Sequence, residues 1–114
     1  MIDAAEFLEQ EVEVFVDRPM GSQHPEHGFI YPINYGYVPN TIGSDGEPVD
    51  AYVLGEFVPL NRFVGHCIAV IRRLDDCDDK LVVVERGNHY TDEQIVALTE
   101  FQERFFTSII LRSK

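Results

Sequence analysis

The sequence has few cysteines, few basic residues and no long apolar run. Its two cysteines, Cys67 and Cys77, are too few for a disulfide framework, and none of its four histidines stands at a zinc-finger spacing. No stretch approaches the roughly 18 apolar residues of a membrane span. The acidic opening Met-Ile-Asp-Ala-Ala-Glu does not predict a signal peptide, and we expect a cytoplasmic protein.

The scarcity of basic residues leaves a strongly acidic chain. Nine Lys and Arg stand against twenty Asp and Glu, which gives a net charge of −11. Such a chain repels nucleic-acid backbones and anionic membrane surfaces, so we expect neither as a partner. Its 114 residues, without repeats or linkers, predict one domain over residues 1–114. A chain this short buries a modest share of its surface, and we expect a homo-oligomer.

Alternation of apolar residues with a period of two predicts most of the regular structure as strands. We expect strands over residues 12–16, 49–54, 65–71 and 80–84. Residues 29–39 are rich in aromatic residues, and an extended backbone there places three tyrosines on one face: Tyr31, Tyr35 and Tyr37.

The two ends of the chain differ from this pattern. Residues 3–10 indicate a short acidic helix or a loose arm. Thr91 and Gln94 form a capping box for a C-terminal helix, whose apolar residues recur at helical spacing: Ile95, Leu98, Phe101 and Phe105. The fold class is therefore β-rich α+β, a small, mostly antiparallel barrel or strongly curved sheet with a C-terminal helix packed on it. We expect Tyr37, Phe101, Phe105 and Phe106 to be packing residues.

The run Asp45-Gly-Glu-Pro-Val-Asp50 places three carboxylates in a sharp turn that leads into an apolar strand. Hard cations such as Mg²⁺ are bound by several oxygens, which such a turn supplies. A solvated acidic loop is the alternative. A calcium EF-hand is excluded, because Asp50 stands where that loop needs glycine.

A second acidic run, Asp75-Asp-Cys-Asp-Asp-Lys80, also leads into a strand. Taken alone, this run indicates a solvated turn. However, Lys80 stands at the start of an apolar strand, as Asp50 does. Clustered carboxylates would repel a phosphate substrate unless Mg²⁺ stood between them, and the same ion would activate a water. Two such turns therefore favour a site that holds metal and phosphate together.

The segment Tyr31-Pro-Ile-Asn-Tyr-Gly-Tyr-Val-Pro-Asn-Thr41, followed by Asp45-Gly-Glu-Pro-Val-Asp50, resembles the family I soluble inorganic pyrophosphatases. Members of that family carry a Tyr-Pro-x-Asn-Tyr-Gly-Tyr segment and an Asp-Gly-Asp-Pro-x-Asp signature. The resemblance covers roughly residues 12–85. It implies a distorted five-stranded barrel of OB type and Mg²⁺-dependent hydrolysis of pyrophosphate to two phosphates in the cytoplasm.

The resemblance also implies roles for individual residues. It implies that Glu47 assists the attacking water, with Asp45 and Tyr35 also catalytic. Phosphate contacts are implied for Lys80 and Tyr35, with Tyr31 lining the same wall and Arg18 as a candidate substitute for a missing arginine. The implied metal ligands are Asp17, Asp45, Asp50, Asp76 and Asp79. How Asp75, Asp76, Asp78 and Asp79 pair with the family's ligands stays open.

Three departures from the family pattern keep other functions open. Glu47 replaces the usual aspartate, only residues 22–29 stand where the family has a hairpin, and Phe105-Phe106 replaces a phosphate-binding Tyr-Lys pair. One alternative is hydrolysis of another phosphoanhydride, such as a nucleotide, for which the shortened hairpin leaves room. The other is a non-catalytic domain that binds a metal–phosphate ligand or a protein partner.

Overall fold

Residues 2–113 contain six strands, one α-helix and one short 3₁₀ helix. The computed structural model describes residues 2–113. In chain order the elements are η1 (Ala4–Phe7), β1 (Glu11–Arg18), β2 (Asn34–Tyr37), β3 (Asp50–Val53), β4 (Arg62–Arg73), β5 (Lys80–Val84), α1 (Asp92–Glu103) and β6 (Ser108–Leu111).

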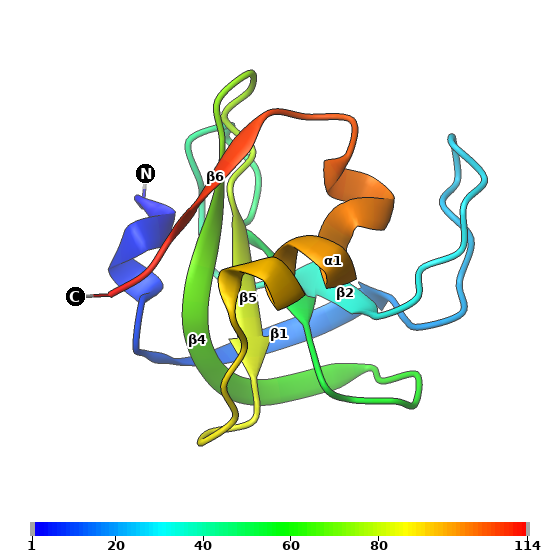
Figure 1. The fold of residues 1–114 in the computed structure, drawn as a ribbon, viewed down its shortest axis with the longest axis horizontal. Helices are drawn as coiled ribbons and strands as arrows, with labels where there is room; N and C mark the ends of the chain where they lie inside the picture. Colours follow the sequence, from blue (N-terminus) through cyan, green and yellow to red (C-terminus); the bar gives the residue numbers. More distant parts are fainter. Residues whose placement is uncertain (1, 114) are drawn as a thin grey trace.

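Five of the strands close into a barrel (Figure 1). They are hydrogen-bonded in the order β1-β2-β3-β5-β4, and β1 also pairs with β4, which completes the ring. The β3–β5 pair is parallel and the other pairs are antiparallel. The helix α1 packs on the outside of this barrel (Figure 1). The predicted five-stranded barrel with a C-terminal helix is therefore confirmed.

Strand β6 was not predicted. It follows α1 and pairs antiparallel with the second half of β4, with Val70 opposite Leu111. The sequence signal was the β-branched pair in Ser108-Ile-Ile-Leu111, a run too short to stand out. The helix was expected to continue to Phe105, but α1 ends at Glu103, so Phe105 lies in the connection to β6.

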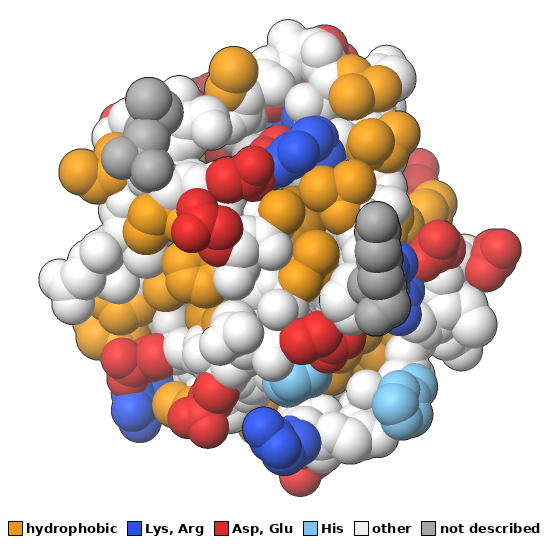
Figure 2. All heavy atoms as spheres, turned by 90° about the vertical axis from the view of Figure 1, so that its left-hand side faces the viewer, with side chains coloured by type: hydrophobic (Ala, Val, Ile, Leu, Met, Phe, Trp, Pro, Cys, Tyr) orange, Lys and Arg blue, Asp and Glu red, His pale blue; other side chains and the backbone are white. Residues whose placement is uncertain are grey.

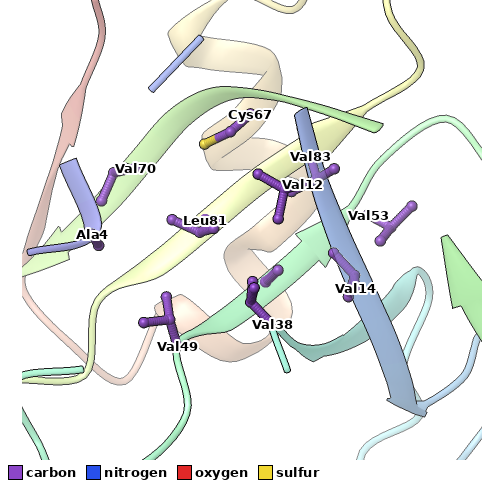
Figure 3. Packing of buried hydrophobic residues seen from close by; sticks show 11 residues of the cluster. Ala4, Val12, Val14, Val38, Val49, Val53, Cys67, Val70, Leu81 and Val83 are labelled. Atoms are coloured by element: carbon purple, nitrogen blue, oxygen red, sulfur yellow. The ribbon is translucent and has the colours of Figure 1, made fainter. Parts of the chain in front are cut away.

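The inside of the barrel is filled by small aliphatic side chains. Figure 3 shows them pointing toward one another from the strands that close the ring. Alternation assigns every second residue to this interior, so Ala51 and Val53 of β3 and Leu81 and Val83 of β5 all point inward. Each of these four side chains is completely buried.

The intervening residues of the same strands point outward, toward α1. Tyr52 and Val82 pack there with Ile95 of the helix in a second buried cluster. The capping box predicted for this helix is present: Thr91 Oγ1 accepts the N–H of Gln94 at 3.1 Å, and the Gln94 side chain accepts the N–H of Thr91 at 2.8 Å. The outward face of β3 and β5 is thus a second core, and the residues at its margin form the site described below.

Gly36 permits close approach of β1 and β2. A Cβ atom at this position would lie 1.9 Å from the carbonyl oxygen of Phe15, so only glycine fits between Tyr35 and Tyr37. Its neighbours in β2 lie opposite β3, where Tyr35 pairs with Tyr52 and Tyr37 with Asp50. Close strand packing here sets where the two tyrosine rings lie.

The segment before β1 forms a short 3₁₀ helix, η1, capped by Asp3. The face that carries both termini mixes apolar side chains with acidic and basic ones (Figure 2). Within residues 2–113, no helix has the length and apolar character that crossing a membrane requires.

Candidate active site

Asp50 and Lys80 start the two parallel strands and lie side by side. They are register partners at the first position of β3 and β5. Asp50 is two residues before Tyr52, and Lys80 is two residues before Val82. Because side chains alternate along a strand, Asp50 and Lys80 therefore lie on the same outward face as Tyr52 and Val82. Strand alternation and parallel register together therefore bring an aspartate and a lysine from the two predicted acidic runs to one point.

Lys80 is the centre of a buried polar cluster. Its ammonium nitrogen donates to Asp50 Oδ2 at 2.6 Å, to Asp78 Oδ2 at 2.7 Å and to the Tyr35 hydroxyl at 2.6 Å. The Tyr35 hydroxyl in turn donates to Asp50 Oδ2 at 2.8 Å. Only 2% of the Lys80 side chain is exposed. The cation is thus held in one position by three oxygen atoms.

Burial shifts the pKa values of two members of this cluster, Asp50 and Tyr35. Desolvation raises the pKa of the Asp50 carboxyl above its ordinary value, against the opposing attraction of Lys80. Desolvation also raises the pKa of Tyr35 far above its ordinary value, and the nearby Asp50 charge adds to this shift. Tyr35 is therefore a neutral phenol at physiological pH and remains a hydrogen-bond donor.

A cavity of about 490 Å³ opens beside Lys80. The four residues expected to contact phosphate all line it, namely Arg18, Tyr31, Tyr35 and Lys80. The Tyr31 hydroxyl donates to Gln102 Oε1 at 2.9 Å, so its proton is already engaged. Tyr31 therefore contributes a ring to the wall, as expected.

A neighbouring cavity of about 360 Å³ is lined mainly by carboxylates. Asp17, Asp45, Glu47, Asp50 and Asp78 face it, together with Tyr37 and Pro48. The Asp45 side chain accepts the backbone N–H of Glu47 at 3.0 Å, which stabilises the turn between them. Asp17, Asp50 and Asp78 line both cavities, so the acidic cavity adjoins the Lys80 cavity.

Asp78 faces the site, whereas Asp76 and Asp79 do not line the two cavities. Asp79 accepts from Arg72 Nε at 3.1 Å, and Asp76 from Arg73 Nη1 at 3.3 Å. Both arginines end β4, and Arg73 Nη1 also donates to Asp78 Oδ2 at 3.5 Å. Sequence reasoning left the choice among the four aspartates open, because it did not include the arginines.

The two acidic turns do meet at one end of the barrel. Asp45 of the first turn and Asp79 of the second line a common small crevice. Asp45, Glu47 and Asp50 of the first turn face one cavity together with Asp78 of the second. Within residues 2–113, no three acidic, histidine or cysteine side chains are close enough to surround one metal ion.

A buried chain of hydrogen bonds, which the sequence analysis missed, joins the helix to this site. Arg73 binds Glu103 with two hydrogen bonds, the Tyr52 hydroxyl donates to Glu103 Oε2 at 2.6 Å, and Gln102 Nε2 donates to Tyr52 at 2.8 Å. Gln102 also accepts from Tyr31. The helical spacing of Ile95, Thr99, Gln102 and Glu103 was the available signal, since these residues form the buried stripe of α1.

Two histidines and two phenylalanines complete the wall of the Lys80 cavity. His24, His27, Phe105 and Phe106 all line it. The expectation that Phe105 packs in the core is wrong: the residue is 53% exposed, because the helix ends before it. Phe106 lies under the Arg73 guanidinium, 3.6 Å from ring centre to the central carbon.

Fold and site together define a small β-barrel protein in which a buried lysine and a group of carboxylates border one open cavity. The chain belongs to the inorganic pyrophosphatase family, whose profile matches residues 4–110.

Curated relatives agree with this assignment. An inorganic pyrophosphatase of Helicobacter pylori is 73% identical over 58 residues, which cover 47% of this chain and 34% of that protein. An inorganic pyrophosphatase of Saccharolobus solfataricus is 35% identical over 111 residues, which cover 82% of this chain and 64% of that protein. The chain thus spans between about a third and two-thirds of the length of these relatives.

A solved structure shares the fold. The crystal structure of inorganic pyrophosphatase from Ehrlichia chaffeensis superposes with a TM-score of 0.69, covering 92% of this chain and 87% of that one. The two sequences are 17% identical in this superposition, so the likeness concerns the fold.

Proposed function

We propose that this protein hydrolyses inorganic pyrophosphate to two phosphates with the help of a divalent cation, Mg²⁺ in the first instance. The observation that carries the proposal is the position of Lys80 and Tyr35 at the border between a cavity open to substrate and a cavity lined by carboxylates. Membership of the family and the names of its curated relatives support the choice of pyrophosphate.

The donor set of the acidic cavity fits a hard cation. Asp17, Asp45, Asp50 and Asp78 present carboxylate oxygens, which are the ligands that Mg²⁺ takes in proteins. Because no three carboxylates in residues 2–113 surround one point, one or two of these four would hold the cation together with waters and phosphate oxygens. When bound, such a cation neutralises phosphate charge and makes a water more acidic. Asp76 and Asp79 do not enter the proposal, because neither lines the Lys80 cavity or the acidic cavity.

Lys80 and Tyr35 would bind the phosphate oxygens, and the charge that develops on the leaving phosphate, in place of the Asp50 and Asp78 oxygens to which they donate in this structure. The ammonium group is buried, so its charge acts in a medium of low dielectric constant. Arg18 lines the same cavity and would add a second cation. The substrate would thus have the cations Lys80 and Arg18 on one side and the carboxylates of the acidic cavity on the other.

Glu47 would orient the attacking water or remove its proton. Its side chain is exposed and lines the acidic cavity, which leaves its carboxylate accessible to a water. A cytoplasmic location and a homo-oligomeric state remain predictions from the sequence.

The test is phosphate release from pyrophosphate by the purified protein, with Mg²⁺ and with EDTA. We expect turnover that requires the metal and that falls by about 100-fold in Asp50→Asn, which removes one charged oxygen and retains the shape. Glu85→Gln is the matched control, because Glu85 is an exposed acid directly after β5. Turnover in EDTA, or full activity of Asp50→Asn at low Mg²⁺, would contradict the proposal.

A further inference from the structure

The Lys80 cavity extends well beyond what two phosphate groups need. Its volume of about 490 Å³ lies within the range of pockets that take whole organic ligands. Polar, charged groups gather at the Lys80 end, where Asp50, Asp78 and Tyr35 meet. The opposite end has no role in pyrophosphate hydrolysis as proposed above.

A wall of rings connects the two ends. The wall begins at Lys80, whose ammonium nitrogen lies 5.3 Å from the centre of the Tyr35 ring. The centres of the Tyr35 and Tyr31 rings are 5.6 Å apart. Tyr31 is 6.1 Å from His24, and His24 is 4.7 Å from His27. An elongated ligand lying along this wall would have one end at the ammonium group and the other at the histidines.

The rings at the far end lie nearly parallel. His27 is 5.7 Å from Phe105 at an angle of 22°, and 6.3 Å from Phe29 at an angle of 5°. These rings stack on one another, and the exposed part of Phe105 leaves room for a flat ligand group to extend the stack.

Phe105 stands at this end with 53% of its surface exposed. A large apolar ring beside a cavity is more costly in water than the same ring covered by a ligand. Next to it, Phe106 packs against the buried guanidinium of Arg73, so the connection that carries both phenylalanines is tied to the site.

We propose that the protein accepts nucleoside diphosphates, with the terminal phosphate at Lys80 and Tyr35 and the base stacked against His27 and Phe105. The inference rests on the proposed function and names a further substrate class for the same site. A base suits this end better than a prenyl chain, because two of its rings are polar imidazoles and its faces are flat.

The reaction is the same as with pyrophosphate. The oxygen of a water forms a bond to the β-phosphorus, the bond from that phosphorus to the bridging oxygen breaks, and the electron pair stays on the nucleoside monophosphate. The products are the monophosphate, inorganic phosphate and one proton. Placing the base at the outer end puts the β-phosphorus at the charged end, where attack is assisted.

The experiment compares ADP, pyrophosphate and geranyl diphosphate as ligands by calorimetry and as substrates by phosphate release, all with Mg²⁺. We expect ADP to bind and to be hydrolysed. Phe105→Ala should weaken ADP binding about 10-fold, the usual effect of removing one base–aromatic contact, and should lower the kcat/KM ratio of ADP to pyrophosphate equally. Phe105→Tyr keeps the ring and should retain binding.

Phe57→Ala is the control, because Phe57 is an aromatic residue that is 84% exposed and does not line this cavity. Hydrolysis of pyrophosphate without binding of ADP would overturn this inference and leave the proposed function standing. Binding of ADP that depends on Phe105, without turnover of either compound, would support the base site and overturn the proposed function. Preference for geranyl diphosphate over ADP would also overturn the inference.

Discussion

The Arg73 guanidinium at the end of β4 holds the Glu103 carboxylate at the end of α1 through hydrogen bonds of 3.0 Å and 2.8 Å. Both side chains are almost fully buried, at 4% and 8% exposure. This pair attaches the last turn of the helix to the barrel directly beside the candidate active site.

Glu103→Ala should therefore destabilise the protein strongly. It leaves the buried Arg73 without its main partner and the Tyr52 hydroxyl without an acceptor, and breaking such pairs costs about 3–5 kcal/mol. Urea unfolding measures the change. Glu100→Ala removes an exposed glutamate from the preceding helical turn and should cost below about 1 kcal/mol. Equal losses in the two variants would show that the buried pair contributes nothing specific.

Lys80→Met tests whether the lysine and a cation share the same carboxylates. The substitution removes a positive charge that contacts Asp50 and Asp78, so those carboxylates should bind Mg²⁺ more tightly. We expect the increase in thermal stability on adding Mg²⁺ to exceed that of the natural protein, by about 1.4 kcal/mol for each tenfold gain in affinity. Phosphate release should be lost. A smaller Mg²⁺ effect in the variant would argue against metal binding at these carboxylates.

Glu47→Asp shortens the carboxylate proposed to handle the water. Glu47 is exposed, so stability should hardly change. Withdrawing the carboxylate by one methylene should lower turnover by about 10- to 100-fold, as displacements of about 1 Å commonly do. Steady-state kinetics with pyrophosphate measure the change. A rise would mean that glutamate is an imperfect replacement for the aspartate of the family signature, and an unchanged rate would remove Glu47 from the mechanism.

The two cysteines should react very differently with thiol reagents. Cys67 is completely buried, and burial raises the pKa of its thiol to about 12, whereas Cys77 is exposed on the second acidic turn. We expect one thiol to react with a disulfide reagent in the native protein and two after unfolding. The Cys77→Ser variant should show none before unfolding, and rapid reaction of two native thiols would contradict the packing around Cys67.

Asp3 should make a small, acid-sensitive contribution to stability. The backbone N–H of Ala5 and the side chain of Arg72 lower the pKa of this carboxyl below its ordinary value of 3.8. Because the folded state binds the proton more weakly, the stabilisation is present above that value and is lost as the pH falls through the lowered pKa.

Asp3→Asn keeps the capping geometry and removes the charge. The substitution should lower the free energy of unfolding by about 0.5 kcal/mol at neutral pH, a small effect because the exposed carboxylate is well screened. It should have no effect at about pH 2, because the carboxyl is then protonated in the natural protein as well. Thermal unfolding of both proteins at the two pH values measures the difference. A deficit that persists at low pH would mean that the charge is not its cause.

Local patterns in the sequence were sufficient for most of the secondary structure. Alternation predicted β1, β3, β4 and β5, and the capping box predicted the start of α1, because these signals depend on residues near one another in the chain. The motif around Tyr35 and the two acidic runs were enough to indicate a site at the start of β3 and β5.

Contacts between distant residues decided the rest. Asp79 binds Arg72, Asp76 binds Arg73, and Asp78 binds both Lys80 and Arg73. No pattern within the run of four aspartates distinguishes these partners. The short β6 exists only by pairing with β4. The exposed position of Phe105 follows from the end of α1, where buried Glu103 binds an arginine thirty residues earlier in the chain. These positions depend on which charged and apolar residues the folded barrel brings together. That is a property of the tertiary structure and not of the local sequence.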